Sequence, residues 1–260
     1  MNMEFYKYQG TGNDFVIADN RDGRYNGLTQ QKVAAICDRR FGIGADGLML
    51  LQLKDGYDFE MAYYNSDGKE GSMCGNGGRC LVNFARKMKV IESTAHFIAA
   101  DGEHYAEILA DGTVKLKMQD VTSVEKGEEY ILLNTGSPHY ISFQANVKAL
   151  DVYTIGKKIR YSKRFANEGV NVNFVETLNE SLYVRTYERG VEDETLSCGT
   201  GVTAAAIAAS GDALKNYQTN ISTPGGNLKV QFTKVDDQTF TDVYLIGPAE
   251  FVFNGSISIY

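Results

Sequence analysis

The chain has 260 residues, of which 43% are hydrophobic and 23% are charged, and its net charge is −7. These values are typical of a globular protein with room for two domains of ordinary size. The acidic balance without a basic stripe argues against nucleic acid as a partner, and the lack of an apolar run of 18 residues argues against a membrane span.

The cysteines and the N-terminal segment indicate a compartment. The first 15 residues alternate charged and apolar side chains, which is unlike an export signal. With four cysteines and no such signal, we expect a reducing cytoplasm. We expect no metal, because the cysteines and the three histidines lack the paired short spacings of a zinc site. No dinucleotide or phosphate-loop fingerprint is present, so we expect no cofactor.

In chain order, the first half is predicted to hold short strands and two helices. Residues 28–39 form an amphipathic pattern with Thr29 as a plausible N-cap. A polar loop at 65–72 leads to Cys74, and from Arg79 the apolar residues recur at helical spacing. The expected strands are residues 5–8, 15–17, 48–51 and 57–64, followed by short strands between 91 and 118.

The second half is predicted to replay this order. Residues 202–209, which follow Cys198, form a strong helical segment that is apolar around most of its girth and is stopped by Gly211. Because a helix that is apolar all round is buried on all sides, we expect a sheet to curl around it. The expected strands are residues 130–133, 140–143, 170–176, 182–187, 240–246 and 251–259.

An internal repeat explains why the two halves are alike. The phrase Cys-Gly-Asn-Gly begins at Cys74 and Cys-Gly-Thr-Gly begins at Cys198, so position 198 minus position 74 gives an offset of 124. A self-similarity at about one domain length predicts two copies of one domain. The same offset, without a gap, relates Thr11-Gly12 to Thr135-Gly136, Phe41 to Phe165, Tyr63 to Tyr187 and Glu70 to Glu194.

These patterns predict an α+β protein of two similar domains related by a pseudo-two-fold axis. Each domain is expected to be a curled antiparallel β-sheet or barrel around a central α-helix, with the site in the cleft between the domains. We assign residues 1–120 plus 248–260 to the domain with Cys74, and residues 121–247 to the domain with Cys198.

The two cysteines have the right surroundings for proton transfer at a carbon centre. A cysteine at a helix N-terminus is near unpaired N–H groups and the positive end of the helix dipole, which stabilise a thiolate and can also hold a carboxylate. One thiolate could remove an α-proton while the other thiol supplies a proton from the opposite face. The alternative reading is that both are small buried hydrophobic residues beside helix ends.

The sequence motifs resemble those of the diaminopimelate epimerases, a family of cofactor-independent amino-acid epimerases, over nearly the whole chain. Proline racemases are similar in the second cysteine phrase, but usually carry His where this chain has Asn76. The motifs that carry the resemblance are Gly12-Asn13-Asp14-Phe15, Gly42-Ile43-Gly44-Ala45-Asp46-Gly47, Asn65-Ser66-Asp67-Gly68, Cys74-Gly75-Asn76-Gly77-Gly78-Arg79-Cys80, Glu188-Arg189-Gly190 and Cys198-Gly199-Thr200-Gly201.

The resemblance implies roles for individual residues. Cys74 and Cys198 would be the acid/base pair, and Arg189 would clamp the distal carboxylate of the substrate. His139 and Glu188 would position or help to ionise the cysteines and contact the α-amino group. The main chain at Gly75, Asn76, Gly199 and Thr200 would hold the reacting carboxylate. The asparagines expected to bind the substrate's distal end or its α-amino group are Asn13, Asn65, Asn76 and Asn171.

This chain departs from the commonest family pattern at three places. Gly47 stands where many members have Gln, Ser137 stands where many have Asn, and the loop from Glu188 to Cys198 carries an acidic run and is one residue longer than usual. These differences affect the fine contacts to the substrate and not the proton transfer.

The expected function is the epimerisation of LL-diaminopimelate to meso-diaminopimelate, which supplies lysine and peptidoglycan precursors. We therefore expect the chain to bind a small amino-acid substrate and to bind neither nucleic acid nor a membrane. The chain could also form a homodimer. Three alternatives stay open on the residues alone: a proline or hydroxyproline racemase, a non-catalytic ligand-binding protein, and a thiol redox protein.

Overall fold

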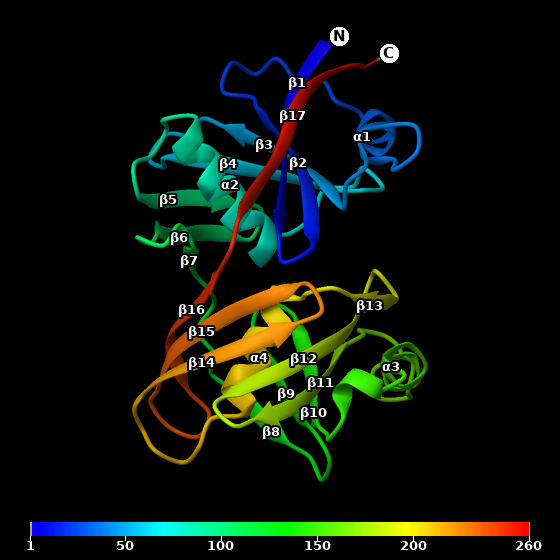
Figure 1. Cartoon of the computed structure of the whole chain (residues 1–260), viewed down its shortest axis with the longest axis vertical. Coiled ribbons are helices and arrows are strands. Elements are labelled where there is room, and N and C mark those ends of the chain that lie inside the picture. The colour runs from blue at the N-terminus through cyan, green and yellow to red at the C-terminus, as the bar shows by residue number, and fades with distance from the viewer. Residues whose placement is uncertain (1, 260) are drawn as a thin grey trace. The chain divides into compact units, whose positions relative to one another are not determined.

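The computed structural model describes residues 2–259, and the chain forms two compact units (Figure 1). One unit comprises Met1–Leu116 with Gly247–Tyr260, and the other comprises Lys117–Ile246. Both units combine one many-stranded sheet with two α-helices, so the predicted α+β class with two similar domains is confirmed.

In the first unit, a sheet runs in the order β17-β1-β2-β3-β4-β5-β6-β7, and β17 is antiparallel to β1. The chain therefore leaves this unit and returns to complete its sheet. The elements are β1 (Asn2–Gly10), β2 (Asn13–Asp19), α1 (Gln30–Cys37), β3 (Gly47–Gln52), β4 (Phe59–Asn65), α2 (Gly75–Lys87), β5 (Thr94–Ala99), β6 (Gly102–Ile108), β7 (Val114–Lys117) and β17 (Glu250–Ser258).

The second unit has a sheet in the order β8-β9-β10-β11-β12-β14-β15-β16, with the short β13 also paired to β12. Its elements are β8 (Val124–Lys126), β9 (Ile131–Asn134), β10 (Pro138–Phe143), the 3₁₀ turn η1 (Val147–Ala149), α3 (Val152–Arg160), β11 (Asn171–Leu178), β12 (Ser181–Glu188), β13 (Asp193–Thr195), α4 (Gly199–Ala208), β14 (Asn216–Thr223), β15 (Gly226–Lys234) and β16 (Phe240–Gly247).

The two units have the same pattern of parallel and antiparallel strand pairs. β2 and β3 are parallel, as are β10 and β11; β4 and β5 are parallel, as are β12 and β14. The other consecutive pairs are antiparallel, so each sheet is mixed where the sequence predicted antiparallel strands. The reason is that a helix or long loop separates each parallel pair, and such a crossover returns the chain in the same direction.

Each sheet has helices against it in corresponding places. In the first unit, α2 packs against β1, β2, β3 and β6, whereas Val33 and Ile36 of α1 join a separate core with Val16 and Leu48. In the second unit, α4 packs against β9, β10, β11, β12, β14 and β15. Eight of the ten residues of α4 are buried, which explains why an Ala-rich segment with no polar face forms the centre of this unit.

The helix boundaries refine the expected ones. Thr29 caps α1, because its side chain accepts a hydrogen bond from the Lys32 N–H. Both buried helices begin earlier than the apolar periodicity indicates, since α2 starts at Gly75 and α4 at Gly199, directly after the two cysteines. No helix was expected at α3, which Asp151 caps by accepting from the Thr154 N–H.

Within residues 2–259, none of the helices combines the length and the apolar character that crossing a membrane requires.

Candidate functional site

Cys74 is the N-cap residue of α2, in extended conformation at φ −108° and ψ 125°. Its carbonyl accepts the first helical hydrogen bond, from the Gly78 N–H at 2.7 Å. The N–H groups of the first helical turn, beginning with Gly75 and Asn76, have no partner within the helix, and they lie at the positive end of its dipole. The helix start therefore provides main-chain donors directly beside the thiol.

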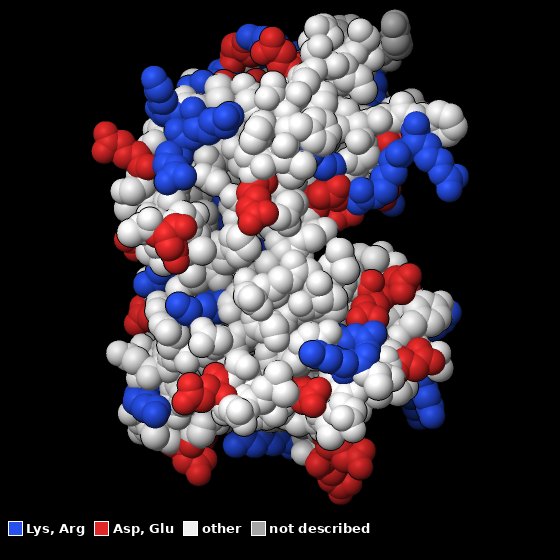
Figure 2. Space-filling view, in the orientation of Figure 1, with Lys and Arg blue, Asp and Glu red and all other residues white. Residues whose placement is uncertain are grey.

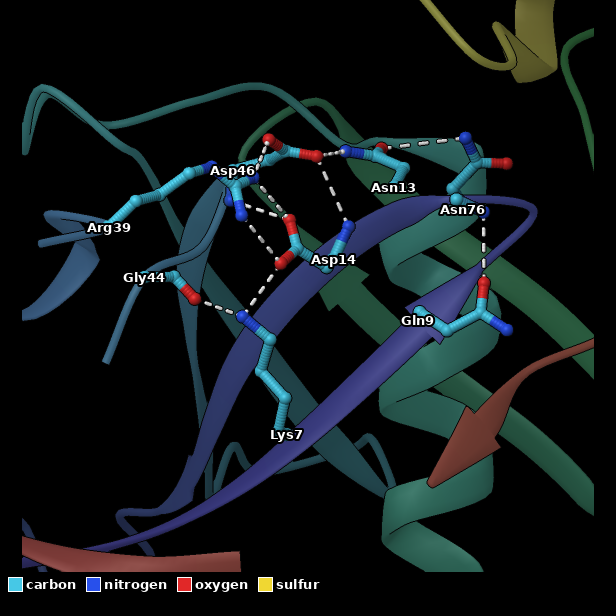
Figure 3. Close-up of polar contacts among 9 residues, drawn as sticks. Lys7, Gln9, Asn13, Asp14, Arg39, Gly44, Asp46 and Asn76 are labelled. Atoms are coloured by element: carbon cyan, nitrogen blue, oxygen red, sulfur yellow. Dashed lines mark hydrogen bonds and ion pairs between the residues drawn. The ribbon is translucent and has the colours of Figure 1, made fainter. Parts of the chain in front are cut away.

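The turn between β1 and β2 brings Asn13 to this helix start. Thr11 and Gly12 both have positive φ, at 51° and 84°, which turns the chain tightly enough to place Asn13 beside Cys74. The Cys74 Sγ donates to Asn13 Oδ1 at 3.5 Å. Asn76 Nδ2 donates to the same oxygen at 3.4 Å (Figure 3). The structure thus brings together three of the predicted site residues.

A charged network lies behind Asn13. Its amide Nδ2 donates to Asp46 Oδ2 at 2.5 Å, and Arg39 Nη2 bridges Asp46 and Asp14 at 2.7 Å to each (Figure 3). Lys7 pairs with Asp14 at 2.7 Å. Burial alone would raise the pKa of Asp14, but hydrogen bonds and positive charge from Arg39 and Lys7 outweigh burial and lower it to about 2.

Arg79 lies on the helix side of the same cluster. It is fully buried, and its guanidinium donates to Asn76 Oδ1 at 3.0 Å and to the carbonyls of Gly75 and Pro248 at 3.1 Å and 3.3 Å. Within residues 2–259 no carboxylate forms an ion pair with Arg79. Burial lowers its pKa to about 10, which leaves it protonated at neutral pH.

Asn65 lies at the exposed end of β4, and Gly47 pairs with it across β3 and β4. A Cβ at Gly47 would lie 2.5 Å from both Tyr63 Cε2 and the Tyr64 carbonyl oxygen. A longer side chain such as glutamine therefore has no room at this position. The next strand's tyrosine occupies the space instead.

Cys198 is the N-cap of α4 and repeats the backbone of Cys74, at φ −116° and ψ 111°. Its carbonyl accepts from the Val202 N–H at 2.9 Å. The side chain is 7% exposed, and its sulfur lies 3.5 Å from Thr200 Oγ1. Thr135, which the repeat relates to Thr11, donates its hydroxyl to the Thr200 carbonyl at 2.8 Å and so holds the first turn of the helix.

His139 is completely buried beside Asn173, a residue that sequence reasoning did not select. Asn173 Nδ2 donates to His139 Nδ1 at 3.0 Å, so the neutral ring carries its proton on Nε2. That Nε2 has no hydrogen-bond partner within residues 2–259. Burial, followed by the charge of Arg189, lowers the pKa of His139 to about 3, so the ring is neutral at physiological pH.

Asn173 links His139 to the start of α4. A Cβ at Gly201 would lie 2.3 Å from Asn173 Oδ1 and 3.3 Å from Cys198 Cβ, so the helix backbone and this amide are in close contact. Asn173 Oδ1 also accepts from Thr186 Oγ1 at 2.9 Å. The strand alternation of Asn171-Val172-Asn173 was the available signal, because residues two apart share one face of a strand.

Asn171 and Arg189 lie together at the end of β11 and β12. Asn171 Oδ1 accepts from the Arg189 N–H at 2.8 Å, and Arg189 Nη1 donates to the Glu168 carbonyl at 2.8 Å. Within residues 2–259 no carboxylate pairs with the Arg189 guanidinium, which leaves it able to bind an anion. Glu188 accepts from Thr195 Oγ1 at 3.0 Å.

Two glutamates of the acidic run in the loop after Glu188 form ion pairs with arginines of the same unit. Glu194 forms a two-point ion pair with Arg185, at 2.6 Å and 2.7 Å, and Glu192 lies 3.3 Å from Arg160. Figure 2 shows that positive and negative side chains are interspersed over the visible face of each unit. The ion pairs of Glu194 and Glu192 hold this loop against its own unit.

Other features of the described residues lie apart from these clusters. Cys37 and Cys80 are buried, and burial raises the pKa of each thiol to about 12, so both are core residues. Within residues 2–259, no three His, Cys, Asp or Glu side chains are grouped as metal ligands. A surface pocket of about 550 Å³ in the second unit contains Arg185 and Glu194 but neither Cys198 nor His139.

Comparison with known proteins identifies relatives over nearly the full length. The family model for diaminopimelate epimerase matches residues 5–124 and 131–252. A diaminopimelate epimerase of Flavobacterium psychrophilum is 50% identical over 98% of this chain and 100% of its own length. That of Chlorobaculum tepidum is 42% identical over 96% of this chain and 99% of its own.

Solved structures share the fold at low identity. A Bacillus anthracis phenazine biosynthesis protein of the PhzF family has a TM-score of 0.77 and 15% identity over all of both chains. A probable proline racemase from Agrobacterium radiobacter has a TM-score of 0.71 and 14% identity over 99% of this chain and 93% of its own.

Proposed function

This chain belongs to the diaminopimelate epimerase family, and from that premise we propose that it interconverts LL- and meso-diaminopimelate by a two-base reaction without a cofactor. The product supplies lysine and peptidoglycan precursors. The observation that carries the proposal is the pair of cysteines at the N-termini of buried helices, each with main-chain donors beside the sulfur. The alternative of a proline racemase is not favoured, because those relatives share only the fold.

The proposed chemistry starts with one cysteine as a thiolate and the other as a thiol. The thiolate takes the α-hydrogen as a proton, and the electron pair of the broken C–H bond remains on the substrate, delocalised onto its α-carboxylate. The other thiol then donates its proton to the opposite face of the carbon, which inverts the stereocentre. After one turnover, the protonation states of Cys74 and Cys198 are exchanged, so the enzyme is set for the reverse direction.

Main-chain groups at the two helix starts would stabilise the charge that develops on the carboxylate. The donors are the N–H groups at Gly75, Asn76, Gly199 and Thr200. Fixed donors of this kind are already oriented before the proton moves, so they stabilise the transition state without reorganising. The same donors and the helix dipole favour the thiolate form of a capping cysteine.

The remaining predicted residues would bind the rest of the substrate. Arg189 would form a two-point pair with the distal carboxylate, for which the planar guanidinium is suited. Asn13, Asn65, Asn76 and Asn171 would bind the distal amino-acid end or the α-amino group. Glu188 would contact the α-amino group, and neutral His139 would orient this region through Asn173.

We further propose a cytoplasmic location and a homodimer. Within residues 2–259 none of the four cysteines forms a disulfide, which is typical of a reducing compartment. β17 exposes three consecutive apolar side chains, Phe251, Val252 and Phe253, and exposed apolar patches commonly mark association surfaces. Light scattering of the purified chain tests the assembly: twice the chain mass supports the dimer, and a monomer at micromolar concentration contradicts it.

Hydrogen exchange tests the proposed reaction directly. The reduced, metal-free protein is incubated with LL-diaminopimelate in deuterated water, and the α-position is followed by NMR. We expect deuterium at the α-carbon together with formation of the meso isomer. Tight binding without any exchange would show a ligand-binding protein instead, and exchange with proline but not with diaminopimelate would show the racemase activity.

A further inference from the structure

The amide of Asn13 has only one orientation that satisfies its neighbours. An ionised carboxylate accepts hydrogen bonds and cannot donate them. The Asp46 carboxylate, 2.5 Å away, therefore selects the Asn13 Nδ2 end. The oxygen end is then turned to the Cys74 thiol at 3.5 Å. The same oxygen accepts from the Asn76 amide at 3.4 Å (Figure 3).

The amide of Asn76 is oriented from the opposite direction. A guanidinium only donates, so Arg79 Nη2, at 3.0 Å, selects the Asn76 oxygen. This turns Asn76 Nδ2 to Asn13. A directional series of hydrogen bonds thus runs from the buried cation through both amides to the Asp46 carboxylate, and each member reinforces the orientation of the next.

Asp46 is itself held firmly. Its Oδ1 accepts from Arg39 at 2.7 Å, and its Oδ2 also accepts from the Asp14 N–H at 3.1 Å. In return, the Asp46 N–H donates to the Asp14 carbonyl at 2.9 Å. Arg39 pairs with both carboxylates and Lys7 pairs with Asp14, so two positive charges lie in the network that holds the acceptor facing Asn13.

We propose that Asp46 is a positioning residue for Cys74, because it holds the Asn13 amide with the oxygen, and not the NH₂ group, against the thiol. An oxygen acceptor stabilises S–H, whereas an N–H donor would stabilise the thiolate. The orientation therefore favours Cys74 as the proton donor of the pair. In its catalytic consequence this inference rests on the proposed function, although the state of the thiol can be measured without turnover.

Alkylation of Cys74 measures this effect. Iodoacetamide reacts with the thiolate, so the rate against pH reports its population. Trypsin cleavage after Lys69 and Arg79 isolates residues 70–79, in which Cys74 is the only cysteine, and mass spectrometry follows that peptide alone. The full chain is compared with Asp46→Asn, which keeps the size of the side chain but lets Asn13 turn over, and with Asp46→Ala, which removes the acceptor.

In both variants, we expect the midpoint of Cys74 alkylation to move to lower pH by about one unit. Asp22→Asn is the matched control, because Asp22 pairs with Arg24 in an exposed site of the same unit and does not contact Asn13; its profile should equal that of the parent. Circular dichroism melts verify that each protein is folded.

Removing a negative charge could by itself favour the thiolate. The charge of Arg79 also acts on this thiol, and Lys7, Arg39 and Asp14 lie in the network around Asp46. Salt separates the two effects, since about 1 M salt shortens the screening length to about 3 Å. A shift that persists at high salt supports positioning through Asn13. A shift that disappears at high salt, or profiles that coincide at all salt concentrations, would overturn the proposal. The alkylation profile of Cys74 can be measured even if the parent protein shows no epimerase activity, so failure of the proposed function and failure of this proposal are distinguishable.

Discussion

The starts of α2 and α4 have the same backbone and different surroundings. Cys74 and Cys198 share cap geometry to within 14° in ψ, and each accepts the first helical hydrogen bond. Around Cys74, the amides of Asn13 and Asn76 bond to the side chains of Asp46 and Arg79. Near Cys198, the Asn173 amide bonds to neutral His139 and to the Thr186 hydroxyl, and the Thr200 carbonyl accepts from Thr135. The repeat therefore preserves the main-chain donors, while the side chains make the two thiols chemically unequal.

The largest expected effect is on the rate of epimerisation when either cysteine thiol is removed, and it tests whether the two helix starts act together. If both act in one proton transfer, Cys74→Ala and Cys198→Ala should each lower the rate of epimerisation by about a thousandfold or more, because each removes one acid/base group. The conversion of LL to meso isomer by chiral chromatography measures this. Cys80→Ala is the control, since Cys80 is a buried core thiol on the same helix. Full turnover in either site variant would exclude the two-base scheme.

The next effect compares the packing of the two helix starts. In Gly201→Ala the new Cβ would meet Asn173 Oδ1 at 2.3 Å, and Asn173 is buried and held by His139 and Thr186. In Gly77→Ala the new Cβ would meet the Met49 methyl group, the flexible end of a side chain. We expect Gly201→Ala to lower the free energy of unfolding by about 3 kcal/mol and Gly77→Ala by about 1 kcal/mol or less.

Urea denaturation of the two variants measures this difference. Equal losses would mean that the second unit adjusts around Asn173 as easily as the first adjusts around Met49. The reverse order would show that Met49 is the more tightly fixed of the two neighbours.

The smallest expected effect is on stability, and it tests whether His139, near Cys198, is neutral in the folded chain. His139 has a folded pKa of about 3 against about 6.5 in the unfolded chain, so it contributes stability that is complete above pH 6.5 and declines as the pH falls. Between pH 7 and pH 5, we expect the free energy of unfolding to fall by about 2 kcal/mol through this residue alone.

His139→Gln removes this titration and serves as the comparison. The difference in unfolding free energy between the parent and the variant should narrow by about 2 kcal/mol between pH 7 and pH 5. A difference that does not change with pH would show that the histidine takes up its proton equally in the folded and unfolded chains.

The sequence predicted the features that depend on short spacings and on the repeat. The cysteine phrases, the buried helices after them and many of the strands follow from local patterns, but β14 and β15 were not among the expected strands. It did not predict α3, although the 124-residue offset carries α1 (Gln30–Cys37) onto 154–161, within a residue or two of the observed helix. The basic run in that segment concealed the periodicity, because Lys157 and Arg160 resemble a solvated surface.

The polar side chains that surround the two thiols could not be predicted from local sequence patterns either. Asp14 and Arg39 are 25 positions apart in sequence, and the pair Lys7 and Asp14 meets the pair Arg39 and Asp46 only because β1, β2 and the loop before β3 are neighbours. Charged residues in isolation indicate surface positions, and their pairing depends on the tertiary arrangement. Asn173 could have been found from its alternation with Asn171, but its contact with Gly201 depends on how α4 packs.

The return of β17 to β1 affects how the protein is made. β17 pairs with β1 along almost its whole length, from Asn2 to Gln9, yet every residue of the second unit is synthesised between them. During translation, β1 can pair with β2 but must wait for β17 on its other edge, while the second unit leaves the ribosome and can already fold. The order of completion is thus the opposite of the order of synthesis, and β1 is the strand that chaperones would have to shield in the interval.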